Sequence, residues 1–219
     1  MFHIILIALA IFGLLSTVPV LADGPICEPF VAIVDGTSLD LAPPAGFVEI
    51  CGQDAQLCHD LTAGYPSSVR TIGYFVLSEE WKQFRKERMG FSRYLIAQLA
   101  LKLSPSDLPG YKQYLRSNQS SVPDHTSLVK IFELKGRAPI GIFLDTEDSI
   151  AFGQIMKLKM NPPAPPKDLI LASTNVMLVA KGKMLSLYAF DDITENMDVE
   201  AVKELTRKWL GCLRTANAR

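Results

Sequence analysis

The stretch DVEAVKELTRKWLGCLR, residues 198–214, decides the fold. Acidic residues open the segment and basic residues crowd its second half, which is the arrangement that the helix dipole favours. Its apolar residues recur at helical spacing and form a single stripe. The stripe consists of Val199, Val202, Leu205, Trp209, Cys212 and Leu213. A helix with one apolar stripe buries it against another layer, so we expect this C-terminal helix to pack on a β-sheet.

Segments upstream of this helix have the patterns of strands that would form such a sheet. The clearest hairpin signal joins 175–180 to 184–190 across Lys181-Gly182-Lys183. Segment 91–103 suits a helix or a strand, and strand is favoured. A turn is expected at 145–148, leading into 149–160, and a stiff proline-rich connector at 161–166. Further strands are expected at 30–34, 38–41, 46–50, 69–77, 128–132 and 140–144.

Two more helices are expected between these strands. One begins at Ser78, where Glu79 and Glu80 occupy the first turn, and places Trp81, Phe84 and Met89 on its inward side. The other is capped by Ser104 or Asp107 and runs to about Ser117, with Leu108, Tyr111 and Leu115 facing inward. A surface loop follows at 118–124. The pattern therefore predicts the α+β class, with a mainly antiparallel sheet covered by helices.

The order of the last elements resembles that of PsbP-like α/β/α sandwiches. The resemblance rests on turn-linked strands, a hairpin tip at Gly182 and Lys183, and a terminal helix that bears Trp209. The early segment Leu41-Ala-Pro-Pro-Ala-Gly-Phe47 is similar to the entry of that group. The resemblance covers about half of the chain and implies the fold only. Members of the group are mostly binding or assembly subunits, and no catalytic residue carries over.

The first 22 residues look like a secretory signal peptide. They are apolar from Ile4 to Leu15 apart from Gly13, and Val20-Leu21-Ala22 suits a signal peptidase. Cleavage after Ala22 would leave residues 23–219, 219 − 22 = 197 residues, as a single α+β domain. Because no Lys or Arg precedes the apolar run, an uncleaved signal anchor stays open. We expect a periplasmic or secreted protein with no membrane span after cleavage.

The formal net charge of −1 limits the classes of partner. Nucleic-acid binding favours a basic face, and anionic membranes attract polybasic segments. The chain has no excess of basic residues that would favour either kind of partner. We therefore expect no nucleic-acid partner, and an unknown protein or small molecule instead.

All four cysteines lie beyond the predicted cleavage point: Cys27, Cys51, Cys58 and Cys212. An even number in an exported chain is typical of disulfides, and three pairings are possible. Pairing of Cys51 with Cys58 would close a short loop. Cys27 with Cys212 would then tie the N-terminal segment to the last helix, the alternative being a buried free thiol at Cys212.

The segment CGQDAQLCHD, residues 51–60, also allows a redox or metal site. Six residues separate Cys51 from Cys58, which is not the two-residue spacing of thioredoxin-type motifs. As zinc ligands, these cysteines and His59 lack a fourth partner. We therefore expect a disulfide-closed loop here and no metal or cofactor.

Acidic residues and histidines provide only isolated candidates for catalysis. Asp145, Glu147 and Asp148 cluster in an expected turn, Asp191 and Asp192 in another, and His125 lies in a polar stretch. Paired carboxylates can run glycoside hydrolysis or hold a hard cation. Turns also favour acids without any such role, and the nucleophile elbow of serine hydrolases is missing from the sequence.

Three functions remain open. We favour an exported, non-catalytic binding or assembly factor. The alternative is a small exported hydrolase or ligand-processing enzyme that uses the acidic residues and His125. The third is a small-molecule carrier, which would need a deep cavity under the helices. Trp81, Phe84, Tyr111 and Tyr114 have the chemistry to line such a cavity, although at helical spacing they are more often core residues.

Overall fold

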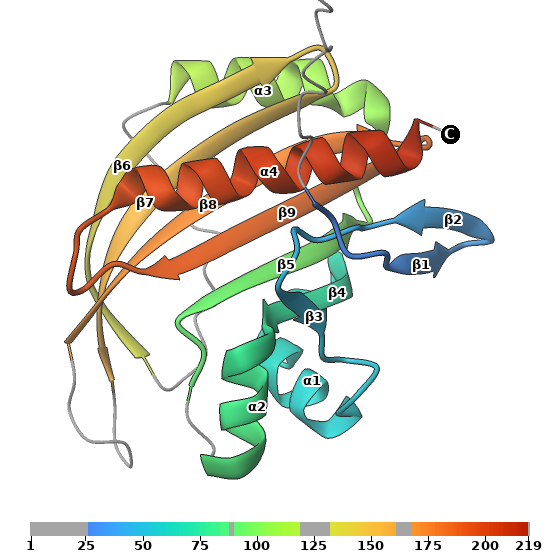
Figure 1. Cartoon of the computed structure of the whole chain (residues 1–219). Coiled ribbons are helices and arrows are strands. Elements are labelled where there is room, and N and C mark those ends of the chain that lie inside the picture. Colours follow the sequence, from blue (N-terminus) through green and yellow to red (C-terminus); the bar gives the residue numbers. More distant parts are fainter. Residues whose placement is uncertain (1–25, 88–89, 119–131, 161–167, 219) are drawn as a thin grey trace, which may run out of the picture.

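A seven-stranded antiparallel sheet forms the body of the protein (Figure 1). The computed structural model describes residues 26–87, 90–118, 132–160 and 168–218. The strand order is β3-β4-β5-β9-β8-β7-β6, and every neighbouring pair is antiparallel. The strands are β3 Phe47–Glu49, β4 Val69–Leu77, β5 Arg93–Ala100, β6 Phe132–Thr146, β7 Ser149–Met160, β8 Asp168–Ala180 and β9 Lys183–Asp192. The predicted α+β class is confirmed.

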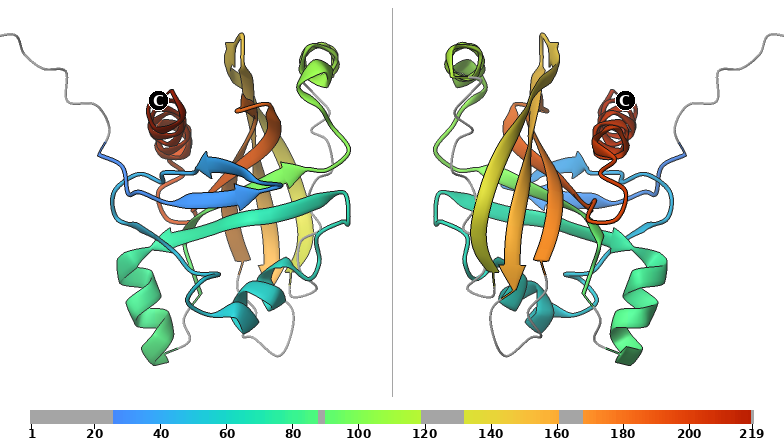
Figure 2. Two further views of the ribbon diagram at one scale, coloured as in Figure 1. Left: turned by 90° about the vertical axis from the view of Figure 1, so that its right-hand side faces the viewer. Right: turned by 90° about the vertical axis from the view of Figure 1, so that its left-hand side faces the viewer.

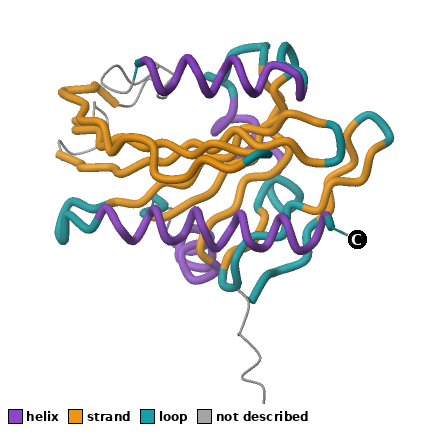
Figure 3. The backbone as a smooth tube through the Cα atoms, turned by 90° about the horizontal axis from the view of Figure 1, so that it is seen from above, coloured by secondary structure: helices purple, strands orange, loops and turns teal. Residues whose placement is uncertain are grey.

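Helices cover both faces of this sheet. The long C-terminal helix α4 (Val199–Asn217) lies on one side of the strands and α3 (Leu108–Ser117) on the other, as Figures 2 and 3 show. The shorter helices α1 (Ala55–Thr62) and α2 (Ser78–Glu87) flank β4 in the sequence. A separate two-stranded sheet, β1 (Val31–Val34) with β2 (Thr37–Asp40), packs against the α4 side.

The α4 side of the sheet is a closed core. Val202, Trp209, Leu210 and Leu213 are buried in one cluster with side chains of β4, β5, β8 and β9. The indole N–H of Trp209 donates to the Leu41 carbonyl at 3.0 Å, so the largest side chain of the interface leaves no polar atom unpaired. This packing is the arrangement predicted from the apolar stripe.

The β8–β9 hairpin turns at Lys181-Gly182, as predicted. Both residues have positive φ, 46° and 71°, which is the conformation that a two-residue hairpin of matching twist requires. The lengths of its strands were underestimated, because β8 begins at Asp168 rather than Asn175. Strand β6 likewise begins before residue 140.

Segment 91–103 contains strand β5, which settles the helix-or-strand ambiguity. Both predicted caps of the following helix act together. The Asp107 carboxylate accepts from the Ser104 backbone N–H at 2.7 Å, and a short 3₁₀ turn at Pro105–Asp107 leads into α3. The pair therefore forms a capping box.

Helix α1 was not predicted. Asp54 is its N-cap and accepts a hydrogen bond from the Leu57 N–H at 2.9 Å. The segment 51–60 is therefore not a loop throughout, because Cys58 and His59 lie on this helix. No residue of α1 is fully buried, which explains why the helix lacks a strong apolar pattern.

Several predictions fall outside the described residues. They are the signal peptide, Met89, the loop after residue 118, most of the strand at 128–132, His125 and the proline-rich connector. Among the residues described, none of the helices combines the length and apolarity needed to cross a bilayer.

Candidate functional site

The face of the sheet opposite α4 contains a cavity of about 830 Å³. Strands β5, β7, β8 and β9 supply its floor, while α1, α3 and the aromatic rings of Phe84 and Phe91 supply its walls. Lys102 and Leu103, which are exposed, also line it, so the cavity reaches the surface beside them. The volume lies within the range of small-molecule sites.

The cavity exists because the core on this face is divided. One buried cluster gathers near α1 and α2 and includes Trp81 and Ile96. A second gathers near α3 and includes Leu115 and Met177. On the α4 face, by contrast, a single cluster covers the middle of the sheet. The space between the two separate clusters is the cavity, and residues of both line it.

The two faces alternate along each central strand. In β5, Leu95 and Ala97 belong to the core under α4, whereas Tyr94, Ile96 and Gln98 line the cavity. This is the period-two alternation of a strand that is buried on both sides.

Aromatic side chains form a continuous wall on the cavity face. Tyr94 stacks on Tyr74 with ring centroids 5.6 Å apart and on Phe190 at 4.5 Å. Tyr188 extends the row beside Phe190 at 6.3 Å. The rings come from the adjacent strands β4, β5 and β9, so the sheet itself holds them in place.

The tyrosines that line the cavity carry no charge at neutral pH. Burial raises the pKa of Tyr65 to about 12 and also raises the pKa values of Tyr74, Tyr94 and Tyr111 above the ordinary range. Burial also raises the pKa of Tyr188, with nearby Ser186 and Asn175 opposing part of the rise. All of these phenols therefore stay protonated.

The charged lining residues are Lys102 and Asp192. Lys102 is exposed at the edge of the cavity. The Asp192 carboxylate is engaged locally, because it accepts from the Thr194 N–H at 3.0 Å and from the Thr194 hydroxyl.

Polar side chains on the floor differ in whether they are paired. The Gln98 amide N–H donates to the Thr71 hydroxyl at 3.5 Å, and the Ser186 hydroxyl donates to the Met177 sulfur at 3.0 Å. Both amide atoms of Asn175 and the Oε1 atom of Gln154 have no hydrogen-bond partner. Buried polar atoms in proteins are normally paired, so these three atoms require an explanation.

The predicted acidic candidates lie away from the cavity, at the turn between β6 and β7. Asp145 pairs with Arg116 of α3 at 2.6 Å and with Lys112 at 3.2 Å. Asp148 pairs with Arg214 of α4 at 2.6 Å. Glu147 is exposed, and its backbone carbonyl accepts from Lys112. Ion pairs therefore connect this turn to α3 through Asp145 and to α4 through Asp148.

The pKa values of these carboxyls follow from their partners. The hydrogen bond from Arg116 lowers the pKa of Asp145. For Asp148, burial raises the pKa, but the hydrogen bonds from Arg214 and Thr146 lower it by more. Asp191 is buried and pairs with Arg93 at 2.6 Å. Asp145 and Asp148 are therefore ionised near neutral pH, and each is paired with an arginine.

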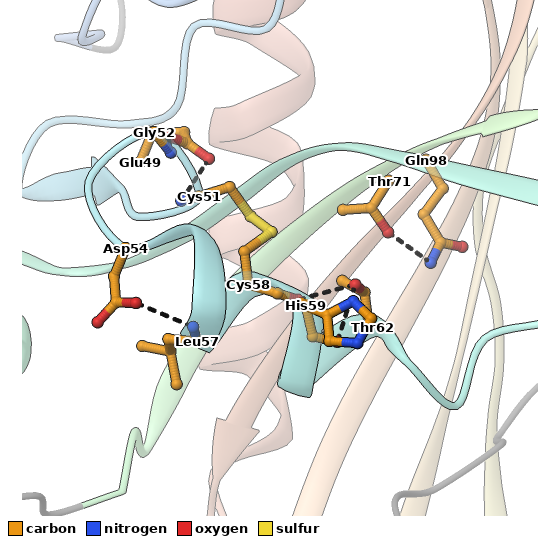
Figure 4. The surroundings of a disulfide bond; sticks show 10 residues. All are labelled: Glu49, Cys51, Gly52, Asp54, Leu57, Cys58, His59, Thr62, Thr71 and Gln98. Atoms are coloured by element: carbon orange, nitrogen blue, oxygen red, sulfur yellow. Dashed lines mark hydrogen bonds between the residues drawn. A yellow bond between two sulfur atoms is a disulfide. The ribbon is translucent and has the colours of Figure 1, made fainter.

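Figure 4 shows the surroundings of the Cys51–Cys58 disulfide. The Glu49 carboxylate accepts from the N–H groups of Cys51 and Gly52, each at 2.9 Å, which fixes the turn before α1. His59 is exposed on that helix. Cys27 and Cys212 form the second disulfide, so both predicted pairings are present. No group of three potential metal-ligating residues occurs in the described part of the chain.

The four aromatic residues considered for a groove have different positions. Phe84 and Tyr111 line the cavity. Trp81 is a core residue whose indole N–H donates to the side-chain amide oxygen of Gln53 at 2.9 Å, and Tyr114 is exposed. Sequence reasoning missed the floor amides Gln98, Gln154 and Asn175. The sequence signal that could have found them is a single side-chain amide among the apolar residues of each strand.

No protein-family model matches the chain, and no curated protein matches it in sequence. Among solved structures, the chain is similar to the Ran-binding protein Mog1p of Saccharomyces cerevisiae, with a TM-score of 0.38 and 9% identity. The match covers 85% of this chain and 94% of that chain. A similarity of this degree identifies neither a family nor a function for this chain.

Proposed function

We propose that the protein is a non-catalytic carrier that binds an apolar small molecule in the cavity between its sheet and helices α1 and α3. The observation that carries the proposal is the cavity of about 830 Å³ with its wall of stacked aromatic rings. A cavity of this size and lining is typical of small-molecule sites. A carrier is the third of the functions that the sequence left open, and not the binding or assembly factor that it favoured.

The compartment proposed is the periplasm or the cell exterior. The two disulfides support it, because such bonds persist in oxidising environments and are rare in the cytosol. The signal-like N-terminal segment supports it independently.

The hydrolase alternative has less support. The carboxylates of Asp145 and Asp148 are paired with arginines and lie outside the cavity lining. A general acid requires a proton at the working pH, whereas both pKa values are lowered.

The test is saturable binding of the neutral dye Nile red to the purified, oxidised protein. We expect fluorescence to saturate at one dye per chain. Ser173→Leu places a larger apolar side chain on the cavity floor and should weaken dye binding by about tenfold, because the added atoms occupy the site. Circular dichroism and thermal unfolding would establish that the variant is folded.

Ser117→Leu is the matched control. It makes the same substitution at an exposed position near the end of α3, outside the cavity lining. We expect its dye affinity to equal that of the unaltered protein. Failure of the unaltered protein to bind Nile red, or equal binding by a folded Ser173→Leu variant, would overturn the proposal.

A further inference from the structure

We propose that the ligand is a neutral molecule with an apolar body and one hydroxyl or amide group, and that this group hydrogen-bonds to Asn175 and Gln154 on the cavity floor. The inference rests on the proposed carrier function and specifies the chemical class of its ligand. It follows from the unpaired amide atoms, their positions in the sheet and the charge of the cavity.

The first argument is that the floor presents both donor and acceptor atoms without partners. Asn175 is 6% exposed and Gln154 is 7% exposed, so bulk water does not reach most of either side chain. The Asn175 side chain lies close enough to the Tyr188 hydroxyl to oppose the rise of its pKa, but no hydrogen bond of normal geometry joins the two. Leaving a buried donor or acceptor unpaired costs about 1–3 kcal/mol. Exchanging the amide O and N of Asn175 changes nothing, because both atoms are unpaired.

The second argument is that one ligand group can reach both residues. Asn175 on β8 is directly opposite Phe152 on β7, and Gln154 is opposite Ser173. Asn175 and Gln154 are therefore diagonal neighbours on one face, about 7–8 Å apart at the backbone. Their side chains both line the same cavity, so a polar group between them can contact both.

The third argument concerns which polar group fits. The Asn175 Oδ1 and Gln154 Oε1 atoms accept, while the Asn175 Nδ2 group donates. A hydroxyl or an amide does both. A carboxylate only accepts, so it would leave the amide oxygens unpaired. It would also place a charge beside tyrosines that stay protonated, with no cationic side chain on the floor.

The experiment compares four ten-carbon compounds as competitors of Nile red at about pH 8: decanol, decanamide, decane and decanoate. They share an apolar chain and differ in the polar group. We expect decanol and decanamide to compete about tenfold more strongly than decane or decanoate, as follows from pairing atoms that otherwise stay unpaired.

Asn175→Leu replaces the amide with an apolar group of similar size. In this variant we expect decanol and decane to differ by less than about threefold. Leu171→Met is the matched control, since it changes another cavity-lining residue of β8 and leaves the amides intact. It should keep the full preference for decanol.

The outcomes separate the two proposals. Equal competition by all four compounds, or strongest competition by decanoate, would refute the ligand class while the carrier function stands. Binding of no compound, including Nile red, would refute both. The comparison within the unaltered protein decides the matter even if Asn175→Leu does not fold.

Discussion

The two faces of the central sheet are built from the same strands but are filled differently. On the α4 face, one apolar cluster contains Trp209 and the small residues Ala172 and Ala189, all almost fully buried. On the opposite face, two clusters leave a cavity of about 830 Å³ between them. On the α4 face the hydroxyls of Thr174 and Thr206 pair at 2.6 Å, whereas on the cavity face neither amide atom of Asn175 has a partner.

This difference separates stability from binding within one sheet. Apolar packing and paired hydrogen bonds on the α4 face stabilise the fold. The cavity face has less apolar packing and contains unpaired polar atoms. Both features lower the stability of the fold unless a ligand binds. Substitutions on the two faces should therefore have unequal effects.

The largest effect is expected from the disulfide on the α4 face. Replacing Cys27 and Cys212 with alanine opens a ring whose ends are 185 residues apart in sequence. The free energy of unfolding should fall by about 5 kcal/mol, because the unfolded chain gains conformational entropy. Urea denaturation measures the change.

The comparison is with the disulfide near the cavity. Replacing Cys51 and Cys58, which are separated by 7 in sequence, should cost only about 2–3 kcal/mol. Equal losses in the two double variants would mean that chain entropy does not set the difference.

The next effect compares adjacent residues of β8 that point to opposite faces. Ala172→Leu overfills the closed core, where Ala172 is 0% exposed, and should destabilise the protein by about 1–3 kcal/mol. Ser173→Leu enters the cavity and should cost less than about 1 kcal/mol, since space is available. Thermal unfolding of both variants measures the difference. A larger loss of stability from Ser173→Leu than from Ala172→Leu would contradict the assignment of Ala172 to the closed core and Ser173 to the cavity.

A smaller effect concerns alkaline pH and Tyr65. Its folded pKa of about 12 exceeds the ordinary value of 10.0, so the folded state holds its proton more tightly than the unfolded state. The stability it contributes is fully present below pH 10 and is lost as the pH rises towards about 12. Tyr65→Phe should reduce the loss of stability over this range by up to about 1.4 kcal/mol per pH unit.

Urea denaturation from about pH 8 to pH 12 tests this prediction. The substituted and unaltered proteins should have the same pH dependence below the ordinary tyrosine pKa and should diverge above it. Parallel curves across the whole range would show that Tyr65 ionises as easily in the folded state as in the unfolded chain.

The smallest effects are expected at the β6–β7 turn. Asp145→Asn removes the ion pairs with α3, and Asp148→Asn removes the one with α4. Because these pairs are partly exposed, each change should cost about 0.5–1 kcal/mol near neutral pH. Their pKa values are lowered in the folded state, so this stability is present above pH 3.8 and is lost as the pH falls through the folded values.

The two substitutions should also differ in their effect on Nile red affinity. Only Asp145→Asn should alter Nile red affinity, because Lys112 and Arg116, its partners, lie on the helix that contributes Tyr111 to the cavity. Dye binding and thermal unfolding at acid and neutral pH measure both effects. A change in dye affinity from Asp148→Asn alone would contradict the division between the faces.

The closed face could be predicted from the sequence and the cavity could not. The stripe that contains Val202, Trp209 and Leu213 predicted both the helix and the sheet beneath it. The bond from Cys212 to Cys27 was predicted as the pairing that remains once Cys51 pairs with Cys58. Strands β5 and β9 carry apolar residues on both faces. Periodicity therefore shows that both faces are buried but not which of them is hollow.

Two further features of the candidate site depend on the tertiary structure. Helix α1 has no fully buried residue, so its pattern was too weak to predict although Asp54 occupies a typical N-cap position. Asn175 and Gln154 are visible in the sequence as amides among apolar neighbours. Only the fold shows that they face a shared cavity and that their atoms lack partners.

The Cys27–Cys212 bond has a consequence for how the molecule is made. The ribosome completes Cys27 185 residues before its partner, and Cys51 and Cys58 appear between them. If the chain enters an oxidising compartment N-terminus first, the earliest thiols that can meet Cys27 are therefore incorrect ones. Its correct pairing needs either delay or thiol exchange, and it requires that α4 has been synthesised. A truncated chain without α4 has no native partner for Cys27, so the native Cys27–Cys212 bond, and not the oxidation of Cys27 alone, reports that α4 has been synthesised.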